Sequence, residues 1–328
     1  MAKILYSDYY IPENIVSAEE ILFKSNQFRQ ASGEMDIYES IEKYVKETNL
    51  HSIAVGRKDE IVEVLSKLVE RMLDKLDIDK SKIKTIFYTS YEEYIYGGNI
   101  SVPHYLQEKF QLNDATVVIL NQDCSSTIQA IKMANSLNVI EGEFSLIISP
   151  YFLSDDEERF IEFTILGDGA GIMLIGDDID QKGFNIVGST SASNGRMSVA
   201  AYNFDKSAEL VDPYYNYLKN KMGTFEAMRR VFSKLVASNE EKFKNANKII
   251  IQNIADNFFN TYYKMYKVPD DSFYNNYLGG HIGDVDIIRN FKDFTEENNF
   301  KIGDEIILLA IGSDFMGMNS GAVFLKYF

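Results

Sequence analysis

Runs of apolar, β-branched residues alternate along this chain with segments whose apolar residues recur at helical spacing. The run at 83–90 (IKTIFYTS) is typical of a buried strand, whereas 58–76 places Ile61, Leu65 and Leu68 on one face of a helix. Strands that are apolar throughout, with helices between them, are expected in sheets that are covered on both faces. The pattern therefore predicts an α/β fold.

The strand-like runs recur about half a chain apart. Three pairs of runs correspond in this way: 83–90 with 249–253, 145–150 with 306–311, and 170–176 with 321–327. Offsets of roughly 150 to 166 residues are too long for a solenoid and indicate a duplicated domain. We expect two similar halves, 1–176 and 177–328, with an irregular crossover at 194–212.

Composition and charge narrow the class of protein. The chain has 328 residues, of which 45% are hydrophobic, and its five prolines and lack of a low-complexity linker indicate halves packed against each other. No run approaches the roughly 18 apolar residues of a membrane span, and no signal-like start is present, so a cytoplasmic location is expected. A net charge of -16 without a Lys/Arg stripe argues against nucleic acid as a partner.

The single cysteine, Cys124, is the first candidate for chemistry. One cysteine cannot form an internal disulfide, and the three histidines and Cys124 form no cluster for a zinc site. Cys124 follows the strand-like run 117–120 and precedes a helix-like segment that begins near Ser125. The positive end of a helix dipole favours the thiolate, which suits a nucleophile. Because cysteine is also often buried, a packing role is the alternative.

Several segments resemble the β-ketoacyl-acyl-carrier-protein synthase III family of the thiolase superfamily, and the resemblance covers most of the chain. They are the cysteine segment LNQDCSSTIQAI, the segment TILGDGAG at 164–171, and the closing runs KIGDEIILLAIGSDF and SGAVFLKYF. The resemblance implies a thiolase-like fold, with two βαβαβ-type halves in αβαβα layers, and a homodimer. GDGAG precedes a strand instead of opening a helix, so we expect a tight turn and no dinucleotide site.

Two positions depart from the family pattern. Condensing members pair the cysteine with a histidine in an HQAN-like segment and with an asparagine in a GN segment. Here Gln252 stands at the histidine position and His281 at the asparagine position. Both side chains can donate to an enolate oxygen, but position 252 holds no general base. Ordinary decarboxylative condensation is therefore not the first expectation.

The run GHIGDVD at 280–286 is similar to the GHxGxxD motif of synthase-III-like enzymes that pass an acyl group to an oxygen or nitrogen acceptor. This resemblance implies that His281 is the base and that Asp286 is the matching carboxylate. Asp284 is the alternative residue for orienting the imidazole. His51 and His104 match no motif and are expected at the surface or in packing roles.

Two further groups of residues complete the candidate site. The family supplies its oxyanion hole from the cysteine N–H and a glycine-rich turn, which implies Cys124 and a turn that holds Ser313 and Asp314. A carboxylate at position 314 would oppose an oxyanion unless it points away. Arg229 and Arg230, in a helix-like segment, are the candidates for binding the acyl donor or an acidic carrier protein, although a solvated helix face is the simpler interpretation.

Taken together, these residues predict an acyltransferase of the synthase III type. Cys124 would accept an acyl group from acyl-CoA or an acyl carrier protein, and His281 would help to pass it to a small acceptor. The alternatives are a carbon-carbon condensing enzyme and a non-catalytic partner subunit. No metal and no permanently bound cofactor are implied, and the sequence does not identify the acyl chain or the acceptor.

Overall fold

The protein is described from a computed structural model. The structure describes residues 2–90, 95–96, 100–137, 142–161, 164–177, 182–195, 229–255, 270–314 and 317–328. A ten-stranded mixed sheet has the order β14-β13-β15-β16-β12-β1-β11-β8-β4-β7. Its strands are β1 (Lys3–Tyr10), β4 (Ile83–Thr89), β7 (Thr116–Leu120), β8 (Phe144–Tyr151), β11 (Gly169–Gly176), β12 (Phe184–Asn194), β13 (Lys248–Ile250), β14 (Phe273–Tyr274), β15 (Glu305–Asp314) and β16 (Gly317–Tyr327).

The strands divide into two sets of five with the same topology. The first set, β7-β4-β8-β11-β1, and the second set, β14-β13-β15-β16-β12, both read 3-2-4-5-1 when their strands are numbered in chain order. Parallel and antiparallel pairs also correspond between the sets. The sets join where β1 pairs with β12, at Lys3 with Asn185 and Ile4 with Phe184.

The duplicated pattern predicted from the sequence is therefore confirmed. The matched runs form β4 and β13, then β8 and β15, then β11 and β16, which are the second, fourth and fifth strands of their sets. The crossover expected at 194–212 is misplaced, because Asn194 ends β12, which pairs with β16 along its length. The chain enters the second set between Gly176 and Phe184. Residues 196–212 lie outside the described residues.

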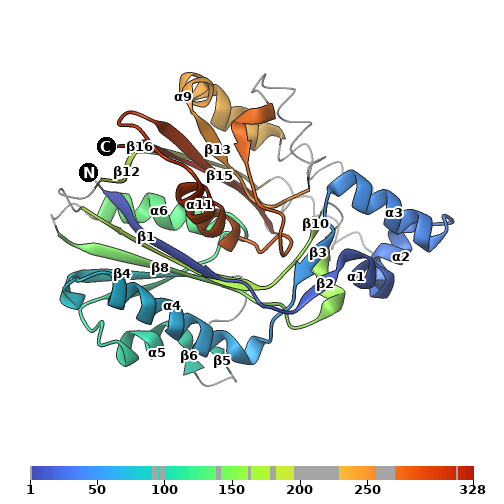
Figure 1. Ribbon diagram of the computed structural model, residues 1–328, viewed down its shortest axis with the longest axis horizontal. Coiled ribbons are helices and arrows are strands. Elements are labelled where there is room, and N and C mark those ends of the chain that lie inside the picture. Colours follow the sequence, from blue (N-terminus) through green and yellow to red (C-terminus); the bar gives the residue numbers. More distant parts are fainter. Residues whose placement is uncertain are drawn as a thin grey trace.

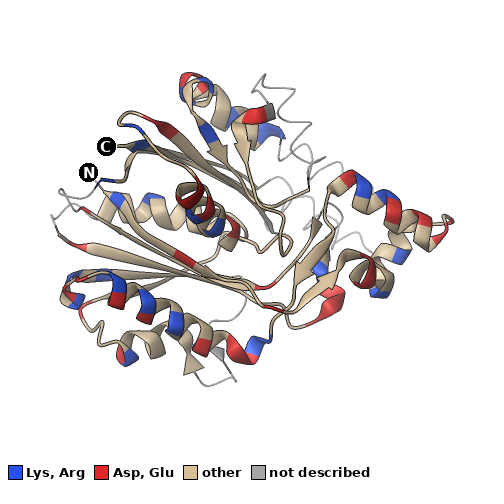
Figure 2. Ribbon diagram, in the orientation of Figure 1, with Lys and Arg blue, Asp and Glu red and all other residues tan. Residues whose placement is uncertain are grey.

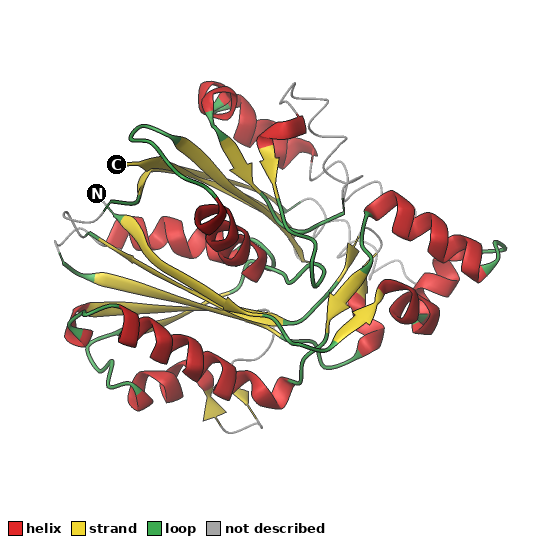
Figure 3. Ribbon diagram, viewed as in Figure 1, coloured by secondary structure: helices red, strands yellow, loops and turns green. Residues whose placement is uncertain are grey.

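Two helices lie between the sets of strands and form a central layer (Figure 1). They are α6 (Ser126–Leu137) and α11 (Val285–Glu297), and each contacts strands of both sets. On the outer face of the first set lie α4 (Ile61–Lys75) and α5 (Val102–Lys109), and α9 (Glu240–Asn245) covers the second. This αβαβα arrangement is the predicted layered fold, and Figure 3 shows the alternation of helices and strands.

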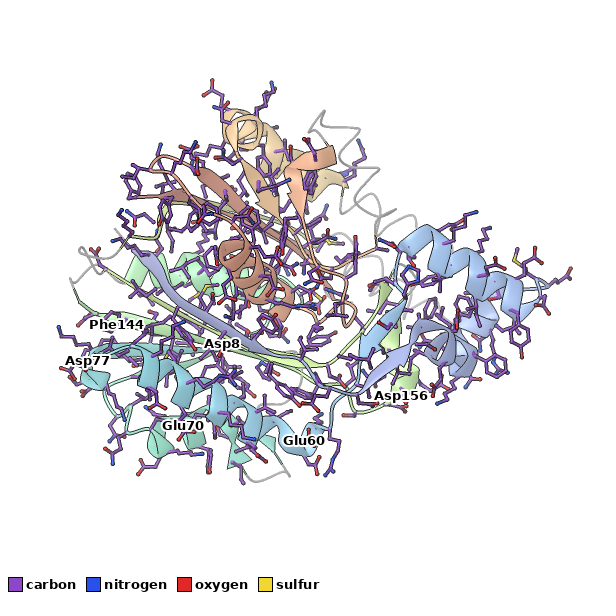
Figure 4. All side chains as sticks on the ribbon, in the orientation of Figure 1. Asp8, Glu60, Glu70, Asp77, Phe144 and Asp156 are labelled. Carbon is purple, nitrogen blue, oxygen red and sulfur yellow. The ribbon has the colours of Figure 1, made fainter. Side chains whose placement is uncertain are left out.

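The burial of each helix follows from its residues. On α6, Ile128, Ala130, Ile131 and Ala134 are all buried, as a helix between two sheets requires. By contrast, α4 is amphipathic and keeps charged residues on its outer face. Figure 2 shows acidic and basic residues mixed on α4, while most residues of the central strands are uncharged. Figure 4 shows side chains filling the space between the two sets of strands.

A small lobe lies beside the sheet. Its elements are β2 (Ile15–Ser17), α1 (Ala18–Lys24), α2 (Asn26–Ser32), α3 (Ile37–Thr48), β3 (Ser52–Ala54), β9 (Phe160–Ile161) and β10 (Thr164–Ile165). Ser17, Ser25 and Asp36 cap its helices with side-chain oxygens. Shorter elements elsewhere are β5 (Ile95–Tyr96), β6 (Ile100–Ser101) and the 3-10 turns η1 (Lys58–Glu60), η2 (Lys80–Lys82), η3 (Asp156–Arg159) and η4 (Asp270–Ser272).

Candidate active site

Cys124 lies in the turn between β7 and α6. Ser125 Oγ donates a hydrogen bond to the Gln122 carbonyl at 2.8 Å, and Ser126 Oγ donates to the Asp123 carbonyl at 2.7 Å. Asp123 has a φ of 49°, in the left-handed region that aspartate tolerates. These bonds hold Cys124 just before the first helical residue, Ser126, where the sequence predicted a strand-to-helix turn.

His281 reaches Cys124 from the other half of the molecule. Its Nε2 lies 3.3 Å from Cys124 Sγ, and its Nδ1 lies 2.5 Å from Asp286 Oδ2. The three side chains are buried. A carboxylate on Nδ1 fixes the tautomer in which Nε2 faces the sulfur without a proton. The arrangement can therefore move a proton between the thiol and the imidazole.

Asp286 is held by donors from its own half of the chain. Besides His281, it accepts the backbone N–H of Asn253 at 2.8 Å, Asn253 Nδ2 at 2.9 Å and the backbone N–H of Ile282 at 3.0 Å. Asn253 Oδ1 in turn accepts Asn290 Nδ2 at 2.8 Å. Sequence reasoning did not assign this role to Asn253, although it lies next to Gln252 in the segment singled out.

The loop that carries His281 depends on its glycines. Gly279, Gly280 and Gly283 all have positive φ angles, of 87°, 80° and 54°. A Cβ on Gly280 would lie 2.6 Å from Ile53 Cγ2, and one on Gly283 would lie 2.4 Å from Tyr151 Cδ2. Because only glycine combines this backbone with such close neighbours, the motif residues around His281 shape the loop.

The GDGAG segment (167–171) and the adjacent strand β10 form backbone hydrogen bonds with this loop. The backbone N–H of His281 donates to the Ile165 carbonyl at 3.1 Å, and the N–H of Gly167 donates to the His281 carbonyl at 2.8 Å. Asp168 forms a buried ion pair with Arg159 at 2.9 Å, and it also accepts two backbone N–H groups. Arg159 also pairs with Asp156, which is labelled in Figure 4. These contacts give the segment a structural role. Its residues 169–171 belong to strand β11, so the expected tight turn is not observed there.

Gln252 lies beside Cys124, and backbone groups engage both ends of its amide. Its Nε2 donates to the Cys124 carbonyl at 2.7 Å, and its Oε1 accepts the N–H of Ile311 at 2.7 Å. The side chain is fully buried. These contacts are those of a residue that positions the Cys124 turn, and a direct catalytic role for Gln252 stays a prediction.

The segment expected to complete the oxyanion hole is extended rather than turned at Gly312. β15 continues through Ser313 to Asp314, because these residues stay paired with β16. A Cβ on Gly312 would lie 2.3 Å from the Gln122 carbonyl, so this strand end lies against the Cys124 turn. Phe315, the last residue of the expected turn, lies outside the described residues. The oxyanion role of Ser313 and Asp314 stays a prediction.

The Cys124 thiol is less acidic than its place before a helix suggested. Burial raises its pKa well above the ordinary value, and the charges of Asp123, Asp284 and Asp286 add to the effect. Asp123 Oδ1 lies 3.5 Å from Sγ. The expected thiolate is therefore disfavoured at rest, since desolvation and nearby carboxylates outweigh the helix end. Attack by this sulfur would require a base, and the His281 imidazole is in contact with it.

Asp284 points to different partners from Asp286. It accepts Ser149 Oγ at 2.8 Å and Thr127 Oγ1 at 3.0 Å. Burial raises the pKa of Asp284 from 3.8 to about 6. Of the two carboxylates considered from the sequence, Asp286 is the one that contacts the imidazole.

The remaining candidates lie at the surface. Arg229 and Arg230 are exposed on a helical segment, residues 229–237, whose other face buries Val231 and Phe232.

Within the described ranges, no group of three or more His, Cys, Asp or Glu side chains could hold a metal ion. None of the helices in these ranges has the length and apolar character of a membrane span. Both His51 and His104 are exposed, which agrees with the expectation for them.

Comparison with known proteins shows similarity in structure. No protein-family model and no curated protein matches the sequence. The 3-oxoacyl-[acyl-carrier-protein] synthase III of Aquifex aeolicus is 17% identical, with a TM-score of 0.70 over 100% of both chains. The acyltransferase ChlB3 is 14% identical, with a TM-score of 0.73 over 99% of this chain and 97% of its own. A variant of OleA from Xanthomonas campestris is 13% identical, with a TM-score of 0.75 over 99% and 98%. The chain therefore has the thiolase-like fold that these synthase III, ChlB3 and OleA structures share, as its sequence predicted.

Proposed function

We propose that this protein is an acyltransferase of the synthase III type. Cys124 would hold an acyl group as a thioester and release it to a small oxygen or nitrogen acceptor. The observation that carries the proposal is the placement of His281, with Nε2 3.3 Å from Cys124 Sγ and Nδ1 2.5 Å from Asp286. A nucleophile, a base and an orienting carboxylate in hydrogen-bond reach are the parts that acyl transfer requires.

In the first half-reaction, His281 Nε2 takes the thiol proton as Cys124 Sγ attacks the carbonyl carbon of the acyl thioester. Collapse of the tetrahedral intermediate breaks the bond between this carbon and the donor sulfur. The leaving thiolate, of coenzyme A or phosphopantetheine, takes the proton back from His281. Asp286 stabilises the imidazolium while it carries this proton.

In the second half-reaction, the acceptor hydroxyl or amine gives its proton to His281 and attacks the thioester carbon. The bond from this carbon to Cys124 Sγ breaks, and the sulfur recovers the proton. The raised pKa of the buried thiol suits this cycle, because the resting sulfur is protonated and is activated only by the adjacent base.

Carbon-carbon condensation is less well supported by the contacts. Decarboxylation of a malonyl unit would need two donors for an enolate oxygen. Gln252, at the position of the family histidine, already donates to the Cys124 carbonyl and accepts from Ile311. Analysis of products from malonyl thioesters would reveal condensation as released carbon dioxide.

A homodimer is the proposed assembly. β7 lies at the end of the sheet, and no strand in the described part of the chain pairs with its outer edge. Ile119 on this strand is 39% exposed. An apolar open edge is an aggregation hazard that pairing with a second copy would cover. Light scattering after size exclusion would give the assembly mass, and a monomer would reject this part of the proposal.

Intact-protein mass spectrometry after incubation with a panel of acyl thioesters tests the reaction itself. We expect the mass of the acyl group to be added in the wild type, and no addition in Cys124→Ala. Adding amine or alcohol acceptors should then remove the adduct from the wild type. His281→Ala should stay folded and lose this turnover. Absence of any adduct on folded, reduced protein would instead favour the non-catalytic partner subunit.

A further inference from the structure

Asp284 is a buried carboxylate that the proton relay does not use. Its hydrogen-bond partners are the hydroxyls of Ser149 and Thr127, at 2.8 and 3.0 Å. It stands at the N-cap position of α11, yet its side chain does not cap that helix. No Lys or Arg of the described ranges forms an ion pair with it within 4.0 Å. The side chain reaches away from its own helix.

Both partners of Asp284 belong to the half of the molecule that carries the nucleophile. Ser149 lies in β8, and Thr127 lies in the first turn of α6, three residues after Cys124. Asp284 itself lies in the His281 loop, in the other half. Its hydrogen bond to Thr127 therefore joins residues 157 positions apart, the same separation as that between Cys124 and His281.

Asp284 and Asp286 consequently make different connections. Asp286 accepts hydrogen bonds from His281, Ile282 and Asn253, which all belong to the second half. Asp284, two residues earlier, binds only side chains of the first half. One carboxylate orients the imidazole within its own half, and the other attaches the loop to the half that holds the sulfur.

Stability alone is a poor reason for a carboxylate at this position. An ionised group that is buried without a cation destabilises the folded state, and the raised pKa of Asp284 reflects this penalty. An uncharged side chain could fill the space. Residues that destabilise the fold, as a buried carboxylate without a cation does, are expected at functional sites. The position of Asp284 beside the Cys124 turn fits that expectation.

We propose that Asp284 is a positioning residue, which docks the His281 loop onto α6 and β8 and thereby sets the contact between His281 Nε2 and Cys124 Sγ. The proposal deepens the proposed function and rests on it only in requiring that His281 acts on Cys124. The position of His281 relative to Cys124 can be tested without an acyl donor.

Alkylation by iodoacetamide provides the test, because Cys124 is the only cysteine of the chain. Its rate is followed by intact mass between about pH 6 and pH 9 in wild type, Asp284→Ala, Asp284→Asn and His281→Ala. Misplacing the imidazole should slow alkylation in Asp284→Ala by about tenfold or more at neutral pH, toward the rate of His281→Ala. Asp284→Asn, which keeps an acceptor for the hydroxyls, should react at least as fast as wild type.

The two substitutions separate positioning from charge. Loss of the negative charge alone would lower the pKa of the Cys124 thiol and accelerate alkylation in both variants, since Asp284 contributes to raising that pKa. Only positioning predicts slow alkylation in Asp284→Ala together with rescue in Asp284→Asn. Ser66→Ala is the matched control for a buried serine, because Ser66 Oγ has no hydrogen-bond partner and lies in α4, away from the site.

Folded Asp284→Ala that reacts as fast as wild type would overturn the proposal. If that variant does not fold, the milder pair Thr127→Val and Ser149→Ala, which removes both hydroxyl donors, decides in its place. Slow alkylation in the pair supports docking, and an unchanged rate rejects it. Failure to form an acyl adduct would reject the proposed function while leaving the alkylation result to stand on its own.

Discussion

Gln252 and Cys124 are joined by a hydrogen bond of 2.7 Å from the side-chain amide to the backbone carbonyl, while the same amide accepts the N–H of Ile311. Gln252 follows β13 of the second set, and Cys124 precedes α6, so this amide links the nucleophile turn to the second half of the molecule. Histidine does not occupy position 252, and within the described residues the imidazole in contact with the sulfur is that of His281.

Replacing Gln252 with alanine should lower the free energy of unfolding by about 2–4 kcal/mol, because a buried N–H and a buried C=O would both lose their partner. Urea denaturation measures this effect, and iodoacetamide reports the accompanying change at Cys124. Gln107→Ala is a matched control, since Gln107 Nε2 donates to the Ala115 carbonyl at 2.7 Å in another part of the molecule. The control should lose stability without changing the reactivity of Cys124.

Asp286→Asn should reduce acyl transfer by about 10² to 10⁴-fold, because the amide no longer fixes the tautomer of His281 or stabilises its cation. The rate of acyl release from Cys124 to an added amine measures the effect. Asp8→Asn, the same substitution at a residue of β1 labelled in Figure 4, should leave transfer intact. Equal rates in Asp286→Asn and wild type would remove Asp286 from the relay.

Gly167, the first glycine of the GDGAG segment, should not tolerate a side chain. A Cβ on Gly167 would lie 2.1 Å from the Gly279 carbonyl oxygen, a fixed backbone atom in the His281 loop. Overpacking of this kind should destabilise Gly167→Ala by about 1–3 kcal/mol or more and displace the loop. Gly195→Ala is the control, because nothing lies within 4 Å of the added Cβ there. Thermal unfolding at the same temperature for both variants would contradict the steric argument.

The duplicated topology was predictable because strands buried on both faces are apolar throughout, and such runs are visible without a structure. β12 was missed for the opposite reason: its sequence FNIVGSTSASN is rich in small polar residues, and pairing with β16 along its length keeps it extended. Pairing of β15 with β16 likewise carries β15 past Gly312 to Asp314. Local composition does not report a partner strand that is distant in the chain.

The candidate site was predictable only in part for a related reason. Cys124 and His281 stood out by their surroundings and by resemblance, but the partners of Asp284 lie more than a hundred positions away. A signal was present in the polar residue Ser149 within the apolar strand FSLIISPY. A hydroxyl in such a strand needs a partner, although the sequence alone does not identify it.

Asp284 should also make stability depend on pH. Burial raises its pKa from 3.8 to about 6 in the folded protein. Below about pH 4 the carboxyl is protonated in both the folded and the unfolded chain and carries no penalty. As pH rises through about 6, the folded protein must ionise a buried group, and the stability that the neutral form provided is lost. The difference between these pKa values corresponds to about 3 kcal/mol.

Asp284→Asn should therefore become more stable than wild type as pH rises, because the amide resembles the neutral carboxyl at every pH. We expect similar free energies of unfolding near pH 4 and an advantage of about 3 kcal/mol for the variant near pH 8. Urea denaturation of both proteins across this range measures the difference, in which the titration of shared groups largely cancels. An advantage that stays constant with pH would mean that Asp284 ionises in the folded protein as easily as in the unfolded chain.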